Sequence, residues 1–249
     1  MIVFVHIRDP NNAGDMASCP AGYFDFGPDV RMQNYSEPIE GAGLVVYGGG
    51  AMVNWLNGRT GLPGGPKVIW GAGSSRHGQT EPWPDPAGFE LIGTREWTAE
   101  REAAGLYAPC ASCLSPLFDG AYPITRAAVA FVNASESIRS RYPAIYGLDL
   151  PTMDNSASMA EIVAFLGSAE TVVTNSYHAC WFGLLLGRKV VCMPYSSKFY
   201  GFKYPIELSN GSDWKEKEKQ AKTYSEALGE SRASSIMFHR RVMEISNGT

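Results

Sequence analysis

Four side chains that can hold an anion or move a proton lie in short polar loops, each shortly after an apolar run. They are Asp15, Arg95, His178 and Lys198. A guanidinium grips a phosphate or carboxylate by two parallel hydrogen bonds, and a lysine adds a point charge. An imidazole can donate to the same anion or act as a general acid. These residue types indicate an anion pocket with a proton-carrying group beside it.

The segment around His178 predicts how this histidine meets Lys198. It reads as a strand, a buried helix and a second strand, over Thr171–Thr174, Ser176–Leu186 and Lys189–Met193. The Ser176 hydroxyl is expected to cap the helix, and Gly187 to end it in a left-handed conformation. Parallel strands joined by a helix cross over right-handedly, and ligands bind beyond their carboxyl ends. Asn175 and Ser176 therefore place His178 at a ligand-binding edge, with Lys198 in the loop after the next strand.

Each of these side chains also has a purely structural explanation. His178 can be a neutral core histidine that is hydrogen-bonded to a neighbouring loop, and Lys198 a solvated loop lysine. Arg95 can pair with a glutamate that follows it, Glu96 or Glu100. The sequence leaves both explanations open for each residue.

The loop after the first apolar run adds a carboxylate. In Asn11–Asp15, Gly14 allows a tight turn, and the exposed amides of the next helix can bind an oxyanion or a sugar hydroxyl. Asp15 either orients or deprotonates an acceptor hydroxyl or serves only as a helix N-cap. Asn12 belongs to the same loop.

Two glycine-rich loops follow later strands, and a pair of cysteines lies in the middle of the chain. Gly49 and Gly73 lie in loops where the absence of a side chain lets a ligand approach the backbone. Cys110 and Cys113 form a C-x-x-C, but no second pair exists to complete a zinc site, and flanking prolines argue against a redox helix. These two cysteines are predicted to be structural thiols.

Composition narrows the class of protein. The chain has 249 residues and a net charge of −4, which argues against a nucleic-acid or anionic-membrane surface. No apolar run approaches the roughly 20 residues of a membrane span, and Met1–Ile7 is expected to be a buried strand rather than a signal peptide. Five cysteines, an odd number in mostly apolar surroundings, indicate reduced thiols and a cytoplasmic protein.

The apolar runs predict an α/β fold with mostly parallel sheets. Near-continuous apolar runs are typical of strands covered on both faces. Strands are predicted at 2–7, 44–47, 67–70, 89–93 and 127–132, and helices at 51–57, 98–104, 135–141 and 158–167. The tail, 214–246, is predicted to form two helices separated at Gly229–Ser231. A loop over 109–123 links two Rossmann-like halves in a GT-B-like arrangement, with the boundaries 1–120 and 121–249.

The loop motifs, in the order in which they occur along the chain, resemble those of the polysaccharide pyruvyl transferase family. The matching elements are Asn12/Gly14/Asp15, Gly48–Gly50, Gly71/Gly73, Gly93/Arg95/Glu96, Asn175–Ala179 and Lys198. Together they extend from about residue 10 to residue 202. The chain departs from the family where many members have an arginine two places before the motif histidine, because Ser176 stands there. It is also shorter than is usual for the family.

The resemblance implies transfer of a pyruvyl group from phosphoenolpyruvate to two hydroxyls of a glycan, giving a cyclic ketal. It implies no metal and no cofactor, with phosphoenolpyruvate and a glycan as the partners. The implied catalytic residues are His178, which protonates the donor's methylene carbon, and Asp15. The implied donor-binding residues are Arg95, Lys198, Ser176 and Asn175. The implied acceptor or backbone loops contain Asn12, Gly14, Gly49 and Gly73.

Two other functions stay open. A glycosyltransferase on the same fold would need a pocket for a base and a ribose in the second half, and the one stretch that could serve there is Tyr146–Asp154, with Asp149 and Asp154. A non-catalytic glycan-binding protein would use its tryptophans to stack on sugars. Neither the acceptor sugar nor the oligomeric state follows from the sequence.

Overall fold

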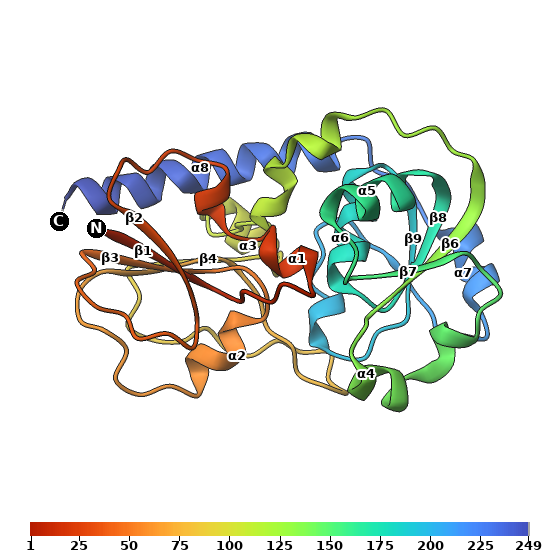
Figure 1. The fold of residues 1–249 in the computed structure, drawn as a ribbon, viewed down its shortest axis with the longest axis horizontal. Coiled ribbons are helices and arrows are strands. Elements are labelled where there is room, and N and C mark those ends of the chain that lie inside the picture. Colours follow the sequence, from red (N-terminus) through yellow and green to blue (C-terminus); the bar gives the residue numbers. More distant parts are fainter. Residues whose placement is uncertain (249) are drawn as a thin grey trace.

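Two β-sheets, each built of parallel strands, lie side by side in the computed structural model, which describes residues 1–248 (Figure 1). The first has the order β2-β1-β3-β4-β5 and the second β10-β9-β8-β6-β7. The strands of the first are β1 (Ile2–His6), β2 (Val30–Asn34), β3 (Leu44–Gly48), β4 (Lys67–Ala72) and β5 (Leu91–Thr94). Those of the second are β6 (Arg126–Val132), β7 (Thr152–Asp154), β8 (Ala169–Thr174), β9 (Lys189–Cys192) and β10 (Glu207–Leu208). All paired strands run parallel, and the predicted two-half, GT-B-like α/β fold is confirmed.

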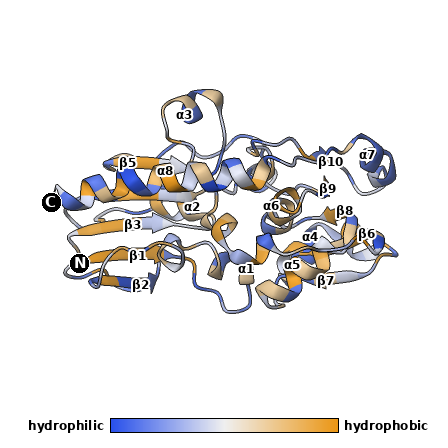
Figure 2. Ribbon diagram, turned by 90° about the horizontal axis from the view of Figure 1, so that it is seen from above, coloured by the Kyte–Doolittle hydropathy of each residue, from blue (hydrophilic) through white to orange (hydrophobic). Residues whose placement is uncertain are grey.

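Helices cover both sheets. The α-helices are α1 (Ala13–Met16), α2 (Met52–Asn57), α3 (Ala99–Ala103), α4 (Glu136–Arg141), α5 (Met159–Gly167), α6 (Tyr177–Leu185), α7 (Trp214–Gln220) and α8 (Ala227–Asn247). Short 3₁₀ turns are η1 (Pro20–Gly22), η2 (Ala111–Leu114), η3 (Pro116–Asp119), η4 (Pro143–Gly147) and η5 (Ser197–Phe199). Figure 2 shows β1 and β5 mostly hydrophobic and the exposed α7 hydrophilic.

The central strands match their predicted positions to within one or two residues, whereas three edge strands were not predicted. β2, β7 and β10 each pair with one neighbour only. In β2, Gln33 is the single buried residue and Met32 is exposed, so no apolar run marks the strand. β7 and β10 have three and two residues. Edge strands bury little surface, so their hydrophobic pattern is weak.

Helix α6 is buried on all sides. All nine of its residues are buried, and a Cβ at Gly183 would press on Val190 of β9. Gly187 ends the helix with φ +64°, as predicted. The predicted capping role of the Ser176 hydroxyl is wrong. Ser176 occupies the N-cap position without a side-chain capping bond, and its backbone N–H donates to Thr174 Oγ1 at 2.9 Å.

The predicted break at Gly229–Ser231 is also wrong. Residues 221–226 separate α7 from α8, and α8 runs unbroken through Gly229 and Ser231. Glycine in a helix costs about 1 kcal/mol, which the packing of α8 exceeds. Ala227 lies in the core of the second half, whereas Phe238 packs 5.2 Å from the ring of Trp70 in the core of the first. Helix α8 thus lies across both halves (Figure 1), and the division at residue 120 stays a prediction.

Loops from the carboxyl ends of the two sheets meet each other. Ala13 N–H donates to the Asn155 carbonyl at 3.1 Å, and Ser75 Oγ donates to Ser196 Oγ at 2.9 Å. Trp97 N–H donates to the Gly201 carbonyl at 2.9 Å. These contacts hold the loops after β1, β4 and β5 against the loops after β7 and β9.

Candidate active site

A cavity of about 110 Å³ lies where these loops meet. Its lining is Ile7, Asn12, Asp15, Gly50, Ala51, Arg95, Asn133, Ser176, Tyr177, His178 and Lys198. The structure therefore brings together six of the residues that the sequence singled out. No role was predicted for Tyr177, which lies within the motif Asn175–Ala179, or for Asn133.

Arg95 is a buried cation with an incomplete set of partners. It is 4% exposed, and its guanidinium carbon lies 3.6 Å from the centroid of the Tyr177 ring. Its Nε and Nη1 have no hydrogen-bond partner among the described residues, and within residues 1–248 it forms no ion pair with Glu96 or Glu100. Burial of a charge that forms no ion pair is costly, so an anion bound in the cavity that Arg95 lines would stabilise this side chain.

The residues next to Arg95 support its position. The Glu96 carboxylate accepts a hydrogen bond from Ser74 N–H at 2.5 Å, and the charge of Arg95 lowers its pKa against the raising effect of burial. A Cβ at Gly73 would overlap the Arg95 side chain, so only glycine lets the arginine pass there. Gly73 is therefore a packing partner of Arg95 and does not line the cavity itself.

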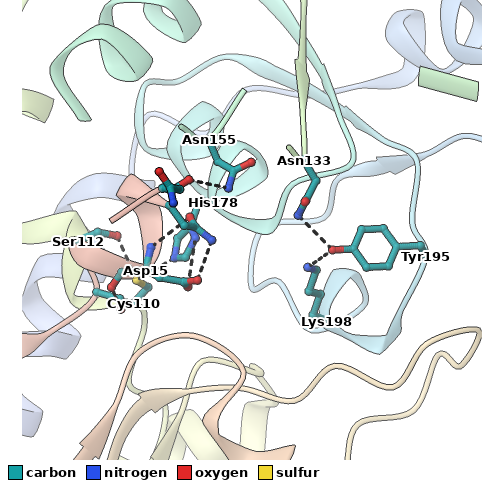
Figure 3. A network of polar contacts seen from close by, with 11 residues as sticks. Asp15, Cys110, Ser112, Asn133, Asn155, His178, Tyr195 and Lys198 are labelled. Carbon is teal, nitrogen blue, oxygen red and sulfur yellow. Dashed lines mark hydrogen bonds and ion pairs between the residues drawn. The ribbon is translucent and has the colours of Figure 1, made fainter. Parts of the chain in front are cut away.

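Lys198 is a second cation, contributed by η5 after β9. Its Nζ donates to Tyr195 Oη at 2.5 Å and lies 4.4 Å from the centroid of that ring (Figure 3). Burial, together with the charge of Arg95, lowers the pKa of Lys198 to about 8. This lysine is therefore not a solvated loop residue, and an anion in the cavity would restore its ordinary basicity.

Asp15 is the third residue of α1, and Asn12 caps that helix. Asn12 Oδ1 accepts from Asp15 N–H at 3.4 Å, and Asn12 Nδ2 donates to Asp15 Oδ2 at 2.7 Å. The alternative that Asp15 is only an N-cap is therefore wrong. Burial raises the pKa of Asp15 to about 6, against the lowering effect of Arg95 and Lys198.

Three residues lie close to the His178 imidazole, and two of them, Asp15 and Cys110, are drawn in Figure 3. Its Nδ1 lies 3.9 Å from Asp15 Oδ1, and its Nε2 lies 3.8 Å from Cys110 Sγ. A Cβ at Gly14 would overlap the imidazole ring. Burial and the charges of Arg95 and Lys198 hold the pKa of His178 well below its ordinary value, so the imidazole is neutral at pH 7.

Asn175 and Gly49 lie beside the cavity rather than in it. Asn175 Oδ1 accepts from Asn133 N–H at 2.8 Å, and its Nδ2 donates to Tyr146 Oη at 3.4 Å. It thereby braces the loop after β6 and lines a neighbouring cavity of about 230 Å³. Gly49, with φ +76°, lies against Ser18 and precedes Gly50, which does line the site.

Three further observations concern metal ions, a second cavity and membranes. Within residues 1–248, no three His, Cys, Asp or Glu side chains are grouped so as to hold a metal ion. A larger cavity of about 420 Å³ lies between the turn after α3 and α8, and none of the charged residues above lines it. None of the helices in the described part of the chain has the length and apolar character that a bilayer crossing requires.

Part of the chain matches a known protein family. Residues 84–197 match the polysaccharide pyruvyl transferase family. The resemblance that the loop motifs indicated is confirmed, and the match indicates a transferase that acts on a polysaccharide. The matching segment contains Arg95, Tyr177 and His178, whereas Asp15 precedes it and Lys198 follows it directly. No curated protein matches the chain.

Proposed function

We propose that this protein transfers a pyruvyl group from phosphoenolpyruvate to two hydroxyls of a glycan, forming a cyclic ketal. The observation that carries the proposal is that two buried cations, the guanidinium of Arg95 and the ammonium of Lys198, line the same small cavity. Phosphoenolpyruvate brings a phosphate and a carboxylate, and a planar guanidinium fits either in a two-pronged contact. Ser176 supplies a hydroxyl at the same wall of the cavity.

The size of the cavity favours a small donor. The cavity has a volume of about 110 Å³. Drug-sized or nucleotide-sized ligands occupy pockets of about 300–1,000 Å³. A three-carbon phosphate ester therefore suits this cavity better than a sugar nucleotide, and the glycan would approach from its open side.

The proton steps follow from the charges around His178. Burial and the charges of Arg95 and Lys198 keep this imidazole neutral. An anionic donor offsets both cations, so its binding raises the pKa of His178 and charges the ring where the donor lies. The imidazolium then gives its proton to the methylene carbon of the donor, which leaves a positive centre at C2. Pre-organised groups of this kind supply a large part of catalysis.

The remaining steps return the protons. A glycan hydroxyl forms a bond to C2 and loses its proton to Asp15, which lies 3.9 Å from the imidazole and can restore it. The bond between C2 and the phosphate oxygen breaks, and the second hydroxyl closes the ring. The two hydroxyl protons thus end on the new methyl group and on the released phosphate, so that atoms and charges balance.

The first test is thermal stability with phosphoenolpyruvate and, separately, with a panel of sugar nucleotides. A ligand at 100 times its Kd adds about 2.7 kcal/mol to the folded state. We expect stabilisation by phosphoenolpyruvate in wild type and in Arg59→Met, but not in Arg95→Met. Arg59 is a matched control, because it also lies over an aromatic ring, 4.2 Å from the centroid of Trp55, away from the site.

Turnover completes the test. Phosphate release that requires a glycan acceptor, and that is lost in His178→Ala, is the expected result. Stabilisation by a sugar nucleotide but not by phosphoenolpyruvate would overturn the proposal in favour of glycosyl transfer. Glycan binding that is unchanged in His178→Ala, without phosphate release in either protein, would indicate a glycan-binding protein.

A further inference from the structure

The thiol of Cys110 lies against one ring nitrogen of His178, and the carboxylate of Asp15 lies nearest the other. Figure 3 draws all three side chains. Cys110 Sγ lies 3.8 Å from His178 Nε2 and 3.1 Å from Ser112 Oγ. Asp15 Oδ1 lies 3.9 Å from the other ring nitrogen, Nδ1. The four side chains form a row from a hydroxyl through a thiol and an imidazole to a carboxylate.

The chemistry of the two neighbours decides which nitrogen carries the proton of the neutral ring. A neutral imidazole has one N–H and one lone pair, and an ionised carboxylate can only accept a hydrogen bond. A proton on Nε2 would turn the lone pair of Nδ1 toward the Asp15 oxygen, which is repulsive. A proton on Nδ1 faces the carboxylate, and it leaves Nε2 to accept from the Cys110 S–H. Ser112 then donates its hydroxyl proton to the sulfur.

We propose that Cys110 is a positioning residue that holds the proton of neutral His178 on Nδ1, the nitrogen that faces Asp15 and the cavity. This tautomer presents a donor N–H to the place where a substrate would lie.

The surroundings of Cys110 agree with this role. It is 1% exposed and unpaired, and Cys113, the other cysteine of the C-x-x-C, lies against Ser235 Oγ at 3.5 Å. Burial raises the pKa of Cys110, so the thiol stays protonated and its S–H can donate a hydrogen bond to Nε2. The C-x-x-C thus divides into one thiol at the imidazole and one thiol in the core.

The tautomer can be read directly by NMR. The chain has four histidines, so a protein labelled with ¹⁵N at histidine gives a simple spectrum, and His178→Gln assigns the signal. At pH 7.5, where Asp15 is ionised, we expect the wild-type proton on Nδ1. In Cys110→Ala the ratio of the Nδ1–H to the Nε2–H form should fall at least tenfold, and Cys110→Ser should restore part of it.

Cys113→Ala is the matched control. It removes a buried thiol from the same turn without touching the imidazole, so the wild-type tautomer ratio is expected. Melting temperatures of all variants establish that they fold. A wild-type proton on Nε2, or an unchanged ratio in Cys110→Ala, would overturn the proposal.

The effect on turnover rests on the proposed function. With phosphoenolpyruvate and a glycan acceptor, Cys110→Ala should lower kcat about 10- to 100-fold with little change in KM, as loss of a supporting partner does elsewhere. Cys113→Ala should retain wild-type kcat. If NMR shows the expected tautomer while wild type releases no phosphate, the proposed function fails and the role of Cys110 stands. If wild type turns over and Cys110→Ala leaves the tautomer ratio unchanged, the proposed function stands and the role of Cys110 fails.

Discussion

The guanidinium of Arg95, which follows the last strand of the first sheet, lies against the ring of Tyr177, which opens α6 of the second half. The distance from guanidinium carbon to ring centroid is 3.6 Å. A desolvated cation–π contact contributes about 2 kcal/mol, which offsets only part of the cost of burying a charge. The contact therefore holds a buried cation between the two halves.

Arg95→Lys should weaken phosphoenolpyruvate binding about 10- to 100-fold. A lysine keeps the charge but has neither the planar fork nor the flat face that stacks on Tyr177. Titration calorimetry measures the change, with Arg59→Lys as the surface control. Equal affinities in Arg95→Lys and wild type would show that the charge alone matters at this position.

The pH dependence of kcat/KM should be bell-shaped, with limbs near pH 6 and pH 8. Below the lower limb Asp15, whose pKa is about 6, is protonated and cannot accept a hydroxyl proton. Above the upper limb Lys198, whose pKa is about 8, loses the charge that binds the donor. Since kcat/KM reports groups of the free enzyme, Lys198→Arg should move the upper limb to much higher pH. A limb that stays near pH 8 in that variant would assign it to another group.

Asp15→Asn should stabilise the fold at neutral pH while reducing turnover. The folded-state pKa of about 6 exceeds the ordinary 3.8, so the carboxyl favours folding only while it is protonated. That contribution is present below about pH 4 and is lost as pH rises through 6. At 1.36 kcal/mol per pKa unit, Asn should add about 2–3 kcal/mol at pH 7.5 and nothing at pH 4. Urea unfolding at both pH values tests this, and equal gains at the two would contradict it.

Gly14→Ala should reduce kcat about 100-fold. A methyl group there would overlap the His178 ring, so the ring or α1 must shift, and a displacement of about 1 Å can cost that much. Gly22→Ala is the control, because a Cβ at Gly22 meets no atom within 4 Å. Wild-type kcat in Gly14→Ala would mean that the spacing between His178 and Asp15 does not limit turnover.

The sequence was most informative where one segment contains all of its own signals. Strands β8 and β9 are apolar runs, and helix α6 between them ends at Gly187 with the predicted left-handed geometry. Because both strands are parallel, His178 and Lys198 had to emerge at one edge, and they do line one cavity. The edge strand β2 escaped detection because Gln33 is its only buried residue.

Contacts between distant segments were not predictable in the same way. The position of Cys110 against His178, and of Tyr177 against Arg95, depends on how the two halves pack. Proline-flanked cysteines look alike whether they fill a core or touch an imidazole. Gly229 looked like a helix break because the local sequence does not show what stabilises α8. Phe238 of this helix packs into the core of the first half.

The position of α8 affects the order in which the two halves can fold during synthesis on the ribosome. All five strands of the first sheet precede residue 95, yet Phe238 and Val242 of α8 belong to the core that contains Trp70. Domains commonly fold in the order of their synthesis, but the nascent first half must leave the Trp70 side of its sheet open while the second half emerges. The first half is completed only by the helix that follows the second, so neither can reach its final stability without the other.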